Sequence, residues 1–179
     1  MKRPADIAIS LALLILLWPL LLLLALIIRM ETPGNPFFGQ QRLGRNEKPF
    51  TIWKLRTMRD GTPHLGTHEV GVDAYTRLGV FLRRTKLDEL PQAFNILVGH
   101  MSLVGPRPCL PGQEAVIAAR RRLDVFSVRP GVTGLAQIRG IDMSRPDELA
   151  AADREYIDSR SMALDLRICV RTVAAVCRQ

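Results

Sequence analysis

The hydrophobic pattern divides the chain into an apolar N-terminal segment and a longer part in which apolar and polar residues mix. Residues 7–28 contain one hydroxyl side chain, one proline and no charged side chain. A straight helix over these residues would be about 33 Å long, and the hydrocarbon core of a bilayer is about 30 Å thick. The segment is therefore long enough to enter or cross a membrane.

Pro19 lies near the middle of this segment. Proline has no backbone N–H and clashes with the carbonyl four residues earlier, which here belongs to Ile15. Both a kinked spanning helix and a re-entrant helix-break-helix hairpin fit the pattern. Lys2 and Arg3 precede the segment, and Arg29 with further basic residues follows it. Because basic residues favour the cytoplasmic side of a membrane, the charges at both ends favour the hairpin.

The remaining pattern predicts a small amount of strand and several helices. Residues 37–43 and 50–55 alternate apolar and polar side chains around a turn-like sequence, which predicts a β-hairpin. Apolar residues at helical spacing predict four helices, over residues 73–86, 88–97, 114–123 and 162–177. The first is basic and amphipathic, as expected either of a core helix with a solvated side or of an interfacial helix on anionic lipid.

These elements place the chain in the α+β class, mainly helical. We expect a re-entrant membrane hairpin over residues 1–30 and a compact cytosolic domain with amphipathic interfacial helices over residues 31–179. Between the β-hairpin and the first of these helices, residues 60–71 hold three glycines together with His64 and His68. Because zinc ligands four residues apart need a helix and a glycine lies between these two, we expect loop histidines instead.

The chain is strongly basic, with 25 lysine and arginine residues against 17 aspartate and glutamate residues and a net charge of +8. Such a surplus suits phosphate esters, nucleic acid or acidic lipids. Basic and aromatic residues are not interleaved as in a single-strand binding platform, so we expect no nucleic acid partner. Three cysteines without a CxxC pair argue against a disulfide scaffold and a zinc site, and no dinucleotide-binding or Walker motif is present.

The densest cluster of charges ends in two adjacent carboxylates. Asp88 and Glu89 follow Arg83, Arg84 and Lys86 within a few residues, and a proline comes soon after them. If a helix begins near this point, both carboxylates lie at its N-terminus, where the helix dipole favours their ionised form. A positioned aspartate there can serve as a nucleophile or as a magnesium ligand, although acidic residues at this place are also common as plain caps.

Two further runs combine a cation with a rigid backbone. Arg107 lies between two prolines, which would give a phosphate-binding guanidinium a stiff mount. Arg129 is followed by Pro130, a glycine and the small hydroxyl of Thr133. Each run also fits an ordinary loop, but together with a basic, membrane-bound chain they suggest a phosphorylated ligand at the bilayer surface.

The order of these motifs resembles one family, the bacterial sugar transferases, which are monotopic polyprenyl-phosphate phosphoglycosyl transferases. The resemblance begins with Lys2, Arg3 and Asp6, includes Pro19 and extends over nearly the whole chain. It is carried by the runs KLRTM at 54–58, LDELPQ at 87–92, NILVGHMSLVGPRP at 95–108, RPGVTGLAQ at 129–137 and LDLRI at 164–168.

The resemblance implies transfer of a phosphosugar from a UDP-sugar to a polyprenyl phosphate such as undecaprenyl phosphate, with release of UMP. Asp88 would be the nucleophile, which forms an aspartyl-phosphosugar intermediate, and Glu89 the second member of the dyad. Mg²⁺ is the implied cofactor, with Asp88 as its contact on the protein. Arg83 is the matching phosphate-site cation, and the candidates added from the residues themselves are Arg107, Arg129 and Thr133.

The resemblance also implies a place in the cell. A re-entrant helix with its break at Trp18 and Pro19 would hold the protein on the cytoplasmic face of the bacterial inner membrane, where Lys2 and Arg3 contact lipid headgroups. There the enzyme would begin the assembly of a membrane glycoconjugate. Two other functions fit the same residues: a membrane-anchored basic binding protein without catalysis, and a magnesium-dependent phosphohydrolase that uses the same dyad.

Two positions depart from the family pattern. His100 stands before Met-Ser where relatives usually have an aspartate, and this change would affect the enzyme only if that acid tunes the site. Trp18 stands before the proline where relatives often have a serine. A serine can hydrogen-bond a carbonyl freed by the proline and also accept a bond, whereas an indole cannot accept one. We therefore expect the bend angle to be affected.

Overall fold

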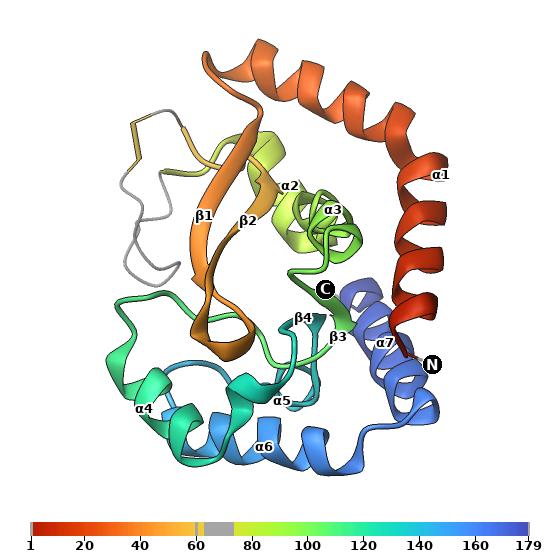
Figure 1. Ribbon diagram of the computed structural model, residues 1–179. Coiled ribbons are helices and arrows are strands. Elements are labelled where there is room, and N and C mark those ends of the chain that lie inside the picture. Colours follow the sequence, from red (N-terminus) through yellow and green to blue (C-terminus); the bar gives the residue numbers. More distant parts are fainter. Residues whose placement is uncertain (1, 60, 63–73, 179) are drawn as a thin grey trace.

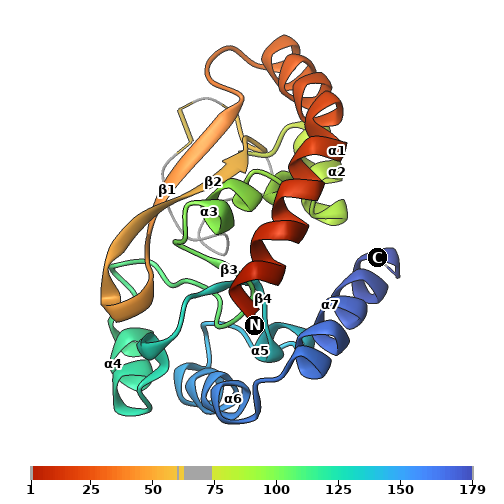
Figure 2. The ribbon, with the colours of Figure 1, turned by 45° about the vertical axis from the view of Figure 1, so that its right-hand side comes forward.

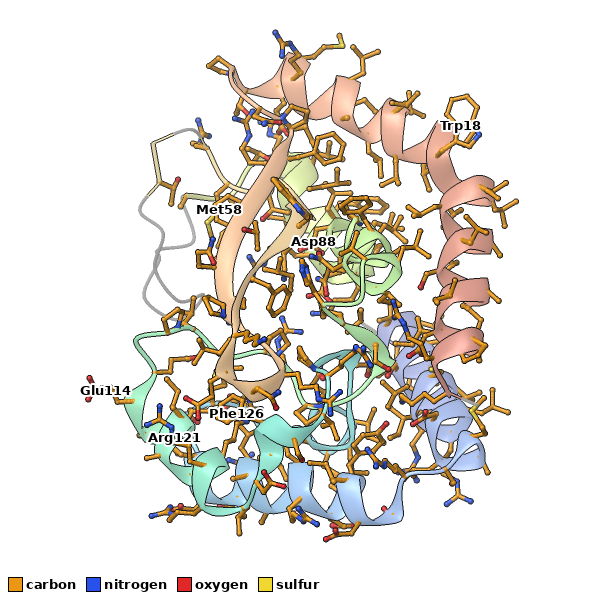
Figure 3. The ribbon with its side chains drawn as sticks, in the orientation of Figure 1. Trp18, Met58, Asp88, Glu114, Arg121 and Phe126 are labelled. Atoms are coloured by element: carbon orange, nitrogen blue, oxygen red, sulfur yellow. The ribbon has the colours of Figure 1, made fainter. Side chains whose placement is uncertain are left out.

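A computed structural model describes residues 2–59, 61–62 and 74–178. Its longest element is α1 (Lys2–Glu31), a single helix that contains Pro19 and bends near Trp18 (Figures 1 and 3). The expected break is thus a bend, because proline removes one hydrogen bond of the ladder while its neighbours keep theirs. Among the described residues, α1 is the one helix that is long and apolar enough to cross a membrane.

The helix α1 is attached to the rest of the protein along its length. Its second half packs Leu24 and Ile28 against Leu55 and Leu82. Its first turn reaches β3 and α7, where Asp6 accepts a hydrogen bond of 2.8 Å from the hydroxyl of Ser102 (Figures 1 and 2). The side that faces away from the domain exposes large apolar residues such as Ile15, Leu16 and Leu22.

The predicted β-hairpin is confirmed. Strands β1 (Phe37–Leu43) and β2 (Pro49–Leu55) pair antiparallel, with Gln40 opposite Ile52. A short 3-10 helix (Arg45–Glu47) joins them, with Asn46 and Glu47 in the left-handed region. A second, parallel pair forms from β3 (Ser102–Val104) and β4 (Gly131–Thr133). With three residues each, these strands are too short to show a periodic pattern, and the sequence pattern did not predict them.

Six helices follow the hairpin in the described part of the chain. They are α2 (Arg77–Thr85), α3 (Gln92–Leu97), α4 (Glu114–Arg122), α5 (Leu135–Ile138), α6 (Pro146–Ser159) and α7 (Met162–Cys177). The predicted helices at 114–123 and 162–177 are confirmed, and the one at 73–86 is shorter, beginning after its N-cap Thr76. The structure adds α5 and α6, so the mainly helical α+β class is confirmed.

The prediction of a helix over 88–97 is wrong in its first part. Residues Leu87–Glu89 form a 3-10 helix, and α3 begins only at Gln92, after Pro91 as its N-cap. Proline lacks the N–H that would continue the ladder backwards, so the two carboxylates lie in a separate turn. The expected loop at 60–71, with His64 and His68, lies outside the described residues except for residues 61 and 62.

Candidate active site

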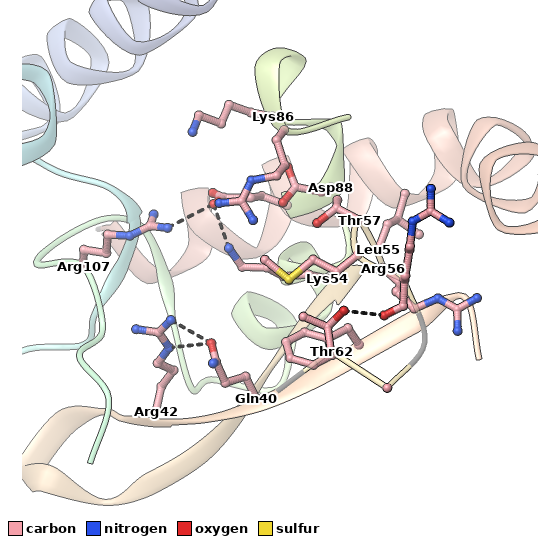
Figure 4. A pocket seen from close by; sticks show the side chains of 16 residues that line it. Gln40, Arg42, Lys54, Leu55, Arg56, Thr57, Thr62, Lys86, Asp88 and Arg107 are labelled. Carbon is pink, nitrogen blue, oxygen red and sulfur yellow. Dashed lines mark hydrogen bonds and ion pairs between the residues drawn. The ribbon is translucent and has the colours of Figure 1, made fainter. Parts of the chain in front are cut away.

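A pocket of about 550 Å³ lies between the β-hairpin, the residues that follow β2, and the 3-10 helix Leu87–Glu89 (Figure 4). Its wall includes seven basic residues: Arg42, Lys54, Arg56, Arg59, Arg83, Lys86 and Arg107. The acidic residues in the same wall are Asp88 and Glu89. This excess of positive charge fits a ligand with several negative charges, such as a diphosphate.

Asp88 is carried into the pocket by a sharp change of chain direction. Lys86 ends α2 in the left-handed conformation, with φ 59°, and the 3-10 helix that follows presents Asp88 to the pocket. Asp88 is only 5% exposed, and its Oδ1 atom is buried without a hydrogen-bond partner in the described part of the chain. Burial raises the pKa of Asp88, while the positive charge of Lys54 acts in the opposite direction.

Glu89 has a very different environment from its neighbour. Its Oε1 atom accepts hydrogen bonds from Lys54 Nζ at 3.0 Å and from Arg107 Nη2 at 3.2 Å (Figure 4). Burial alone would raise the pKa of Glu89, but the charges of Arg107 and Lys54 outweigh it and hold the pKa well below its usual range. Glu89 is therefore ionised and engaged, whereas an oxygen atom of the neighbouring Asp88 has no partner in the part of the chain that the structure describes.

The cations of the pocket are held by contacts from several elements. Arg42 on β1 donates two hydrogen bonds to Gln40 Oε1, at 3.2 and 2.7 Å, and one to the carbonyl oxygen of Pro108 at 3.1 Å. Burial, together with the charge of Arg107, lowers the pKa of Arg42 to about 10, so it stays protonated at neutral pH. The guanidinium of Arg83 lies 4.8 Å from the centre of the Tyr75 ring.

Arg56 connects the pocket to the residues that follow α1. Its guanidinium donates to the carbonyl oxygens of Pro33 and Thr32 at 2.7 and 2.8 Å, and to the hydroxyl of Thr32 at 2.8 Å. These contacts fix the chain just beyond the end of α1 against the rim of the pocket. The C-terminal end of α1 therefore has a defined position relative to Asp88.

The structure brings together four of the six residues proposed from the sequence for chemistry or phosphate binding. Asp88, Glu89, Arg83 and Arg107 all line the pocket, whereas Arg129 and Thr133 do not. Arg129 Nε donates to the carbonyl oxygen of Gly99 at 2.8 Å. The hydroxyl of Thr133 lies 2.6 Å from that of Thr172. The rigid turn at Arg129 therefore joins parts of the fold instead of supplying a cation to the pocket.

Lys2 and Arg3 also have partners within the protein. Lys2 Nζ donates to the carbonyl oxygen of Val104 at 2.9 Å, to the hydroxyl of Tyr156 at 2.7 Å and to Asp165 Oδ2 at 2.5 Å. Arg3 donates to the carbonyl oxygens of Leu97 and Met101 at 3.1 and 3.4 Å. Lipid contact at these two positions stays a prediction, since both side chains already bind the folded domain.

The two departures from the family pattern lie outside the pocket wall. His100 is exposed and packs its ring against that of Phe50, with 5.6 Å between ring centres. Trp18 is exposed at the bend of α1 (Figure 3). Neither side chain touches the dyad, so His100 does not replace an acid of this pocket.

The sequence-based assignment missed several pocket residues on the hairpin. Phe38, Gln40 and Arg42 alternate along β1, and Lys54 on β2 stands opposite Phe38. Their spacing of two residues places them on one face of the hairpin. This signal was present in the sequence, but the pattern alone does not say which face turns toward the 3-10 helix.

The carboxylates of the pocket wall determine how a divalent cation could bind there. No group of three or more histidine, cysteine, aspartate or glutamate side chains suited to a metal ion occurs among the described residues. Glu89 is engaged by two cations, and the buried Oδ1 of Asp88 has no hydrogen-bond partner among the described residues. Because Mg²⁺ is often held by one or two carboxylates together with substrate phosphates and water, these residues fit a metal that binds along with a diphosphate.

Known proteins resemble this chain along its whole length. It is 42% identical to the UDP-glucose:undecaprenyl-phosphate glucose-1-phosphate transferase of Caulobacter vibrioides, over 98% of this chain and 69% of that protein. It is 38% identical to the exopolysaccharide production protein PSS of Rhizobium leguminosarum bv. phaseoli, over 98% of this chain and 94% of the relative.

A transferase of Escherichia coli K12 with the same name as the Caulobacter protein is 35% identical over 97% of this chain, but the match spans only 39% of that longer protein. The family described as bacterial sugar transferase matches residues 1–179. The chain therefore belongs to the bacterial sugar transferase family of enzymes.

Proposed function

We propose that this enzyme transfers a sugar 1-phosphate from a UDP-sugar to polyprenyl phosphate through a covalent intermediate on Asp88. The observation that carries the proposal is the buried Oδ1 of Asp88, which has no hydrogen-bond partner among the described residues, in a pocket with seven basic residues. The Caulobacter and Escherichia coli relatives are named as UDP-glucose:undecaprenyl-phosphate glucose-1-phosphate transferases, which makes UDP-glucose the first donor to test and undecaprenyl phosphate the first acceptor.

The reaction takes two displacements at one phosphorus atom. In the first, a carboxylate oxygen of Asp88 attacks the sugar-bearing phosphorus, an acyl phosphate bond forms, and UMP leaves with the electron pair of the broken P–O bond. In the second, an oxygen of the lipid phosphate attacks the same phosphorus, and the bond to Asp88 breaks. The product is a lipid diphosphate sugar, and the carboxylate of Asp88 is restored.

The charges around Asp88 supply what these steps need. An anionic nucleophile and a diphosphate repel each other, and Arg83, Lys86 and Arg107 in the same wall offset that repulsion and the charge that develops on UMP. Mg²⁺ held by Asp88 and the diphosphate would, when bound, add further positive charge. Glu89 is a weak base, because the charges of Arg107 and Lys54 lower its pKa and both cations bind its Oε1 atom. It orients these two cations.

The membrane part of the proposal is a re-entrant α1 on the cytoplasmic face of the inner membrane. Both ends of α1 contact the same domain: Lys2 binds Asp165, and the carboxylate of Glu31 accepts hydrogen bonds from the backbone N–H groups of Arg77 and Leu78 at 2.9 and 3.3 Å. A straight spanning helix would carry one of these charged ends across the bilayer. The bend at Pro19 lets both ends stay on the side that holds the pocket.

Exposed apolar residues continue from α1 onto neighbouring helices. Large apolar side chains are exposed on α2, α3 and α7 and at the C-cap of α3: Val80, Phe81, Phe94, Val98, Leu166, Val170 and Val173. Apolar faces of this size on amphipathic helices fit a bilayer interface. An active site held at that surface would meet a water-soluble nucleotide sugar and a lipid phosphate without removing the lipid from the membrane.

A transfer assay tests the function. Purified protein in nanodiscs is incubated with UDP-[¹⁴C]glucose, Mg²⁺ and undecaprenyl phosphate, and both released UMP and label in the lipid phase are measured. The proposal expects both products in equal amounts from the wild type, and neither product nor a covalent adduct from Asp88→Asn. Release of glucose phosphate without lipid would indicate a phosphohydrolase, and no turnover with any UDP-sugar would indicate a binding protein.

A labelling experiment tests the topology separately. Single cysteines replace the exposed Pro4 or Pro33 in a background without the native Cys109, Cys169 and Cys177. A membrane-impermeant thiol reagent is then added to intact spheroplasts or to inverted vesicles. The re-entrant arrangement expects both cysteines to react only in inverted vesicles, and labelling from opposite sides would establish a spanning helix.

A further inference from the structure

The segment that presents Arg107 to the pocket is anchored through its carbonyl groups. Pro106 and Pro108 have no backbone N–H, so hydrogen bonding of this segment depends on acceptors more than on donors. Four consecutive carbonyl oxygens, those of residues 106–109, each accept a hydrogen bond, from Gly131 N, Arg120 Nη1, Arg42 Nη1 and Leu43 N respectively. The position of the Arg107 backbone therefore depends on groups from distant parts of the chain.

The donor to the carbonyl of Arg107 is unusual in its burial. Arg120 on α4 and Asp153 on α6 are each only 2% exposed. Arg120 Nε and Nη2 donate to Asp153 Oδ2 at 3.0 and 2.7 Å, and Nη1 donates to the carbonyl oxygen of Arg107 at 2.7 Å. Neither Arg120 nor Asp153 lines the pocket, and α4 and α6 lie on the far side of the hairpin turn from it (Figure 3).

The geometry of a guanidinium group explains how this pair can set a position. The group is planar and its five N–H bonds have fixed directions. Once Nε and Nη2 are bound to Asp153, the direction of Nη1 is determined, and the carbonyl of Arg107 must lie along it. Removal of two charges from water opposes folding, and an apolar pair of similar volume often gives equal or higher folding stability. Helix packing alone therefore does not explain why a charged pair stands here.

We propose that Arg120, oriented by Asp153, is a positioning residue for the transfer reaction, and that it acts by fixing the backbone of Arg107. This proposal rests on the function proposed above. Arg120 binds the backbone carbonyl of Arg107, and the guanidinium of Arg107 lies in the pocket, 3.2 Å from Glu89 Oε1 (Figure 4). In the proposed reaction this guanidinium also contacts the donor's diphosphate. Arg120 itself touches no reacting atom, so its effect must pass through Arg107.

The first variant to test is Arg120→Lys. A lysine can keep the ion pair with Asp153 but has no planar fork with which to hold the carbonyl of Arg107 as well. We expect kcat for transfer to fall by about 10- to 100-fold, with the KM for the donor changed by less than about threefold, because a displaced group near the reaction costs rate more than binding. Arg122→Lys is the matched control, since Arg122 on the same helix pairs with the exposed Asp147.

A double-mutant cycle separates positioning from simple stabilisation. If Arg120 acts through Arg107, then Arg107→Ala and Arg107→Ala/Arg120→Lys should have equal rates, because the second change has nothing further to displace. If the pair only stabilises the fold, the two losses should multiply. Equal rates for Arg107→Ala and the double variant support the proposal. A double variant whose loss is the product of the two single losses overturns it.

A variant with an apolar pair at these two positions tests the proposal if Arg120→Lys does not fold. Arg120→Met/Asp153→Leu removes both buried charges and the donor to Arg107, and such replacements often leave stability unchanged or improved. We expect a folded protein with the same loss in kcat as Arg120→Lys. Full activity in this folded variant would overturn the proposal. Absence of transfer in the wild type, assayed alongside, would instead overturn the proposed function.

Discussion

Replacement of Glu89 by glutamine tests how much the buried charges of the pocket contribute to stability. Glu89 Oε1 accepts from Lys54 Nζ at 3.0 Å and from Arg107 Nη2 at 3.2 Å, and the side chain of Glu89 is only 10% exposed. Glutamine keeps the size and one acceptor oxygen but removes the negative charge. Lys54 is then left in a largely buried place without its counter-charge.

The expected magnitude follows from these contacts. A hydrogen bond to a charged group contributes about 1.5–3 kcal/mol, and removal of one partner from a buried ion pair costs about 3–5 kcal/mol. Because glutamine still accepts a bond and Arg107 is about one third exposed, we expect the lower part of this range, a loss of about 2–3 kcal/mol. For a chain of this size that corresponds to a fall in Tm of about 4–12 °C.

The assay compares Glu89→Gln with Glu155→Gln under identical conditions. Glu155 also accepts two hydrogen bonds, from Arg139 at 2.5 and 2.6 Å, but on the exposed surface of α6. Thermal unfolding in one detergent and at one scan rate is followed by tryptophan fluorescence, to which Trp53, beside Lys54 on β2, contributes together with Trp18. We expect a clear fall for Glu89→Gln and no resolvable shift for Glu155→Gln, and equal shifts would refute the argument from burial.

Three further predictions follow from the same site. Arg107 and Lys54 hold the pKa of Glu89 in the folded protein below its unfolded value of 4.5. The contribution of this carboxylate to folding stability is therefore fully present above that pH and is lost progressively as the pH falls below it. The Tm difference between wild type and Glu89→Gln should therefore shrink as pH falls from 6 toward about 3; a constant difference would contradict this. Asp88→Asn should abolish transfer, because it removes the proposed nucleophile. It should not lower Tm, since burial raises the pKa of Asp88 and the charged form therefore does not stabilise the fold; a large fall in Tm would contradict this. A Cβ on Gly79 would lie 1.9 Å from the carbonyl oxygen of Thr57, so Gly79→Ala should cost at least about 2 kcal/mol in urea unfolding. Gly112→Ala, which meets no atom within 4 Å, is its control.

The local pattern of the chain was enough to predict several elements. Continuous apolar sequence over 7–28 predicts a helix that can enter a membrane, because it is long enough and carries no charge. Alternation over 37–43 and 50–55 predicts the hairpin, because side chains of a strand alternate between its two faces. The adjacent Asp88 and Glu89 mark a candidate site, and it was the resemblance to the bacterial sugar transferases that connected them with phosphosugar transfer. These inferences use only residues that are near one another in sequence.

Other features depend on contacts between residues that are distant in sequence. Strands β3 and β4 are too short to show a period, and they exist because residues 102–104 and 131–133 meet in space. Arg107 and Arg129 occur in similar proline-flanked turns, yet one enters the pocket and the other binds Gly99. No local pattern distinguishes them, because the difference lies in what each turn packs against.

The amino-acid sequence alone thus determined the long apolar helix and the hairpin and pointed to the two adjacent acids, because apolar length, alternation and charge are properties of neighbouring residues. Only the tertiary structure decided how these acids differ. It brings Lys54 from the hairpin, 35 positions away, and Arg107 from beyond α3 onto Glu89. It also buries an oxygen atom of Asp88 that has no hydrogen-bond partner among the described residues. The charge on a carboxyl group depends on which cations surround it in three dimensions, and that arrangement exists only in the folded chain.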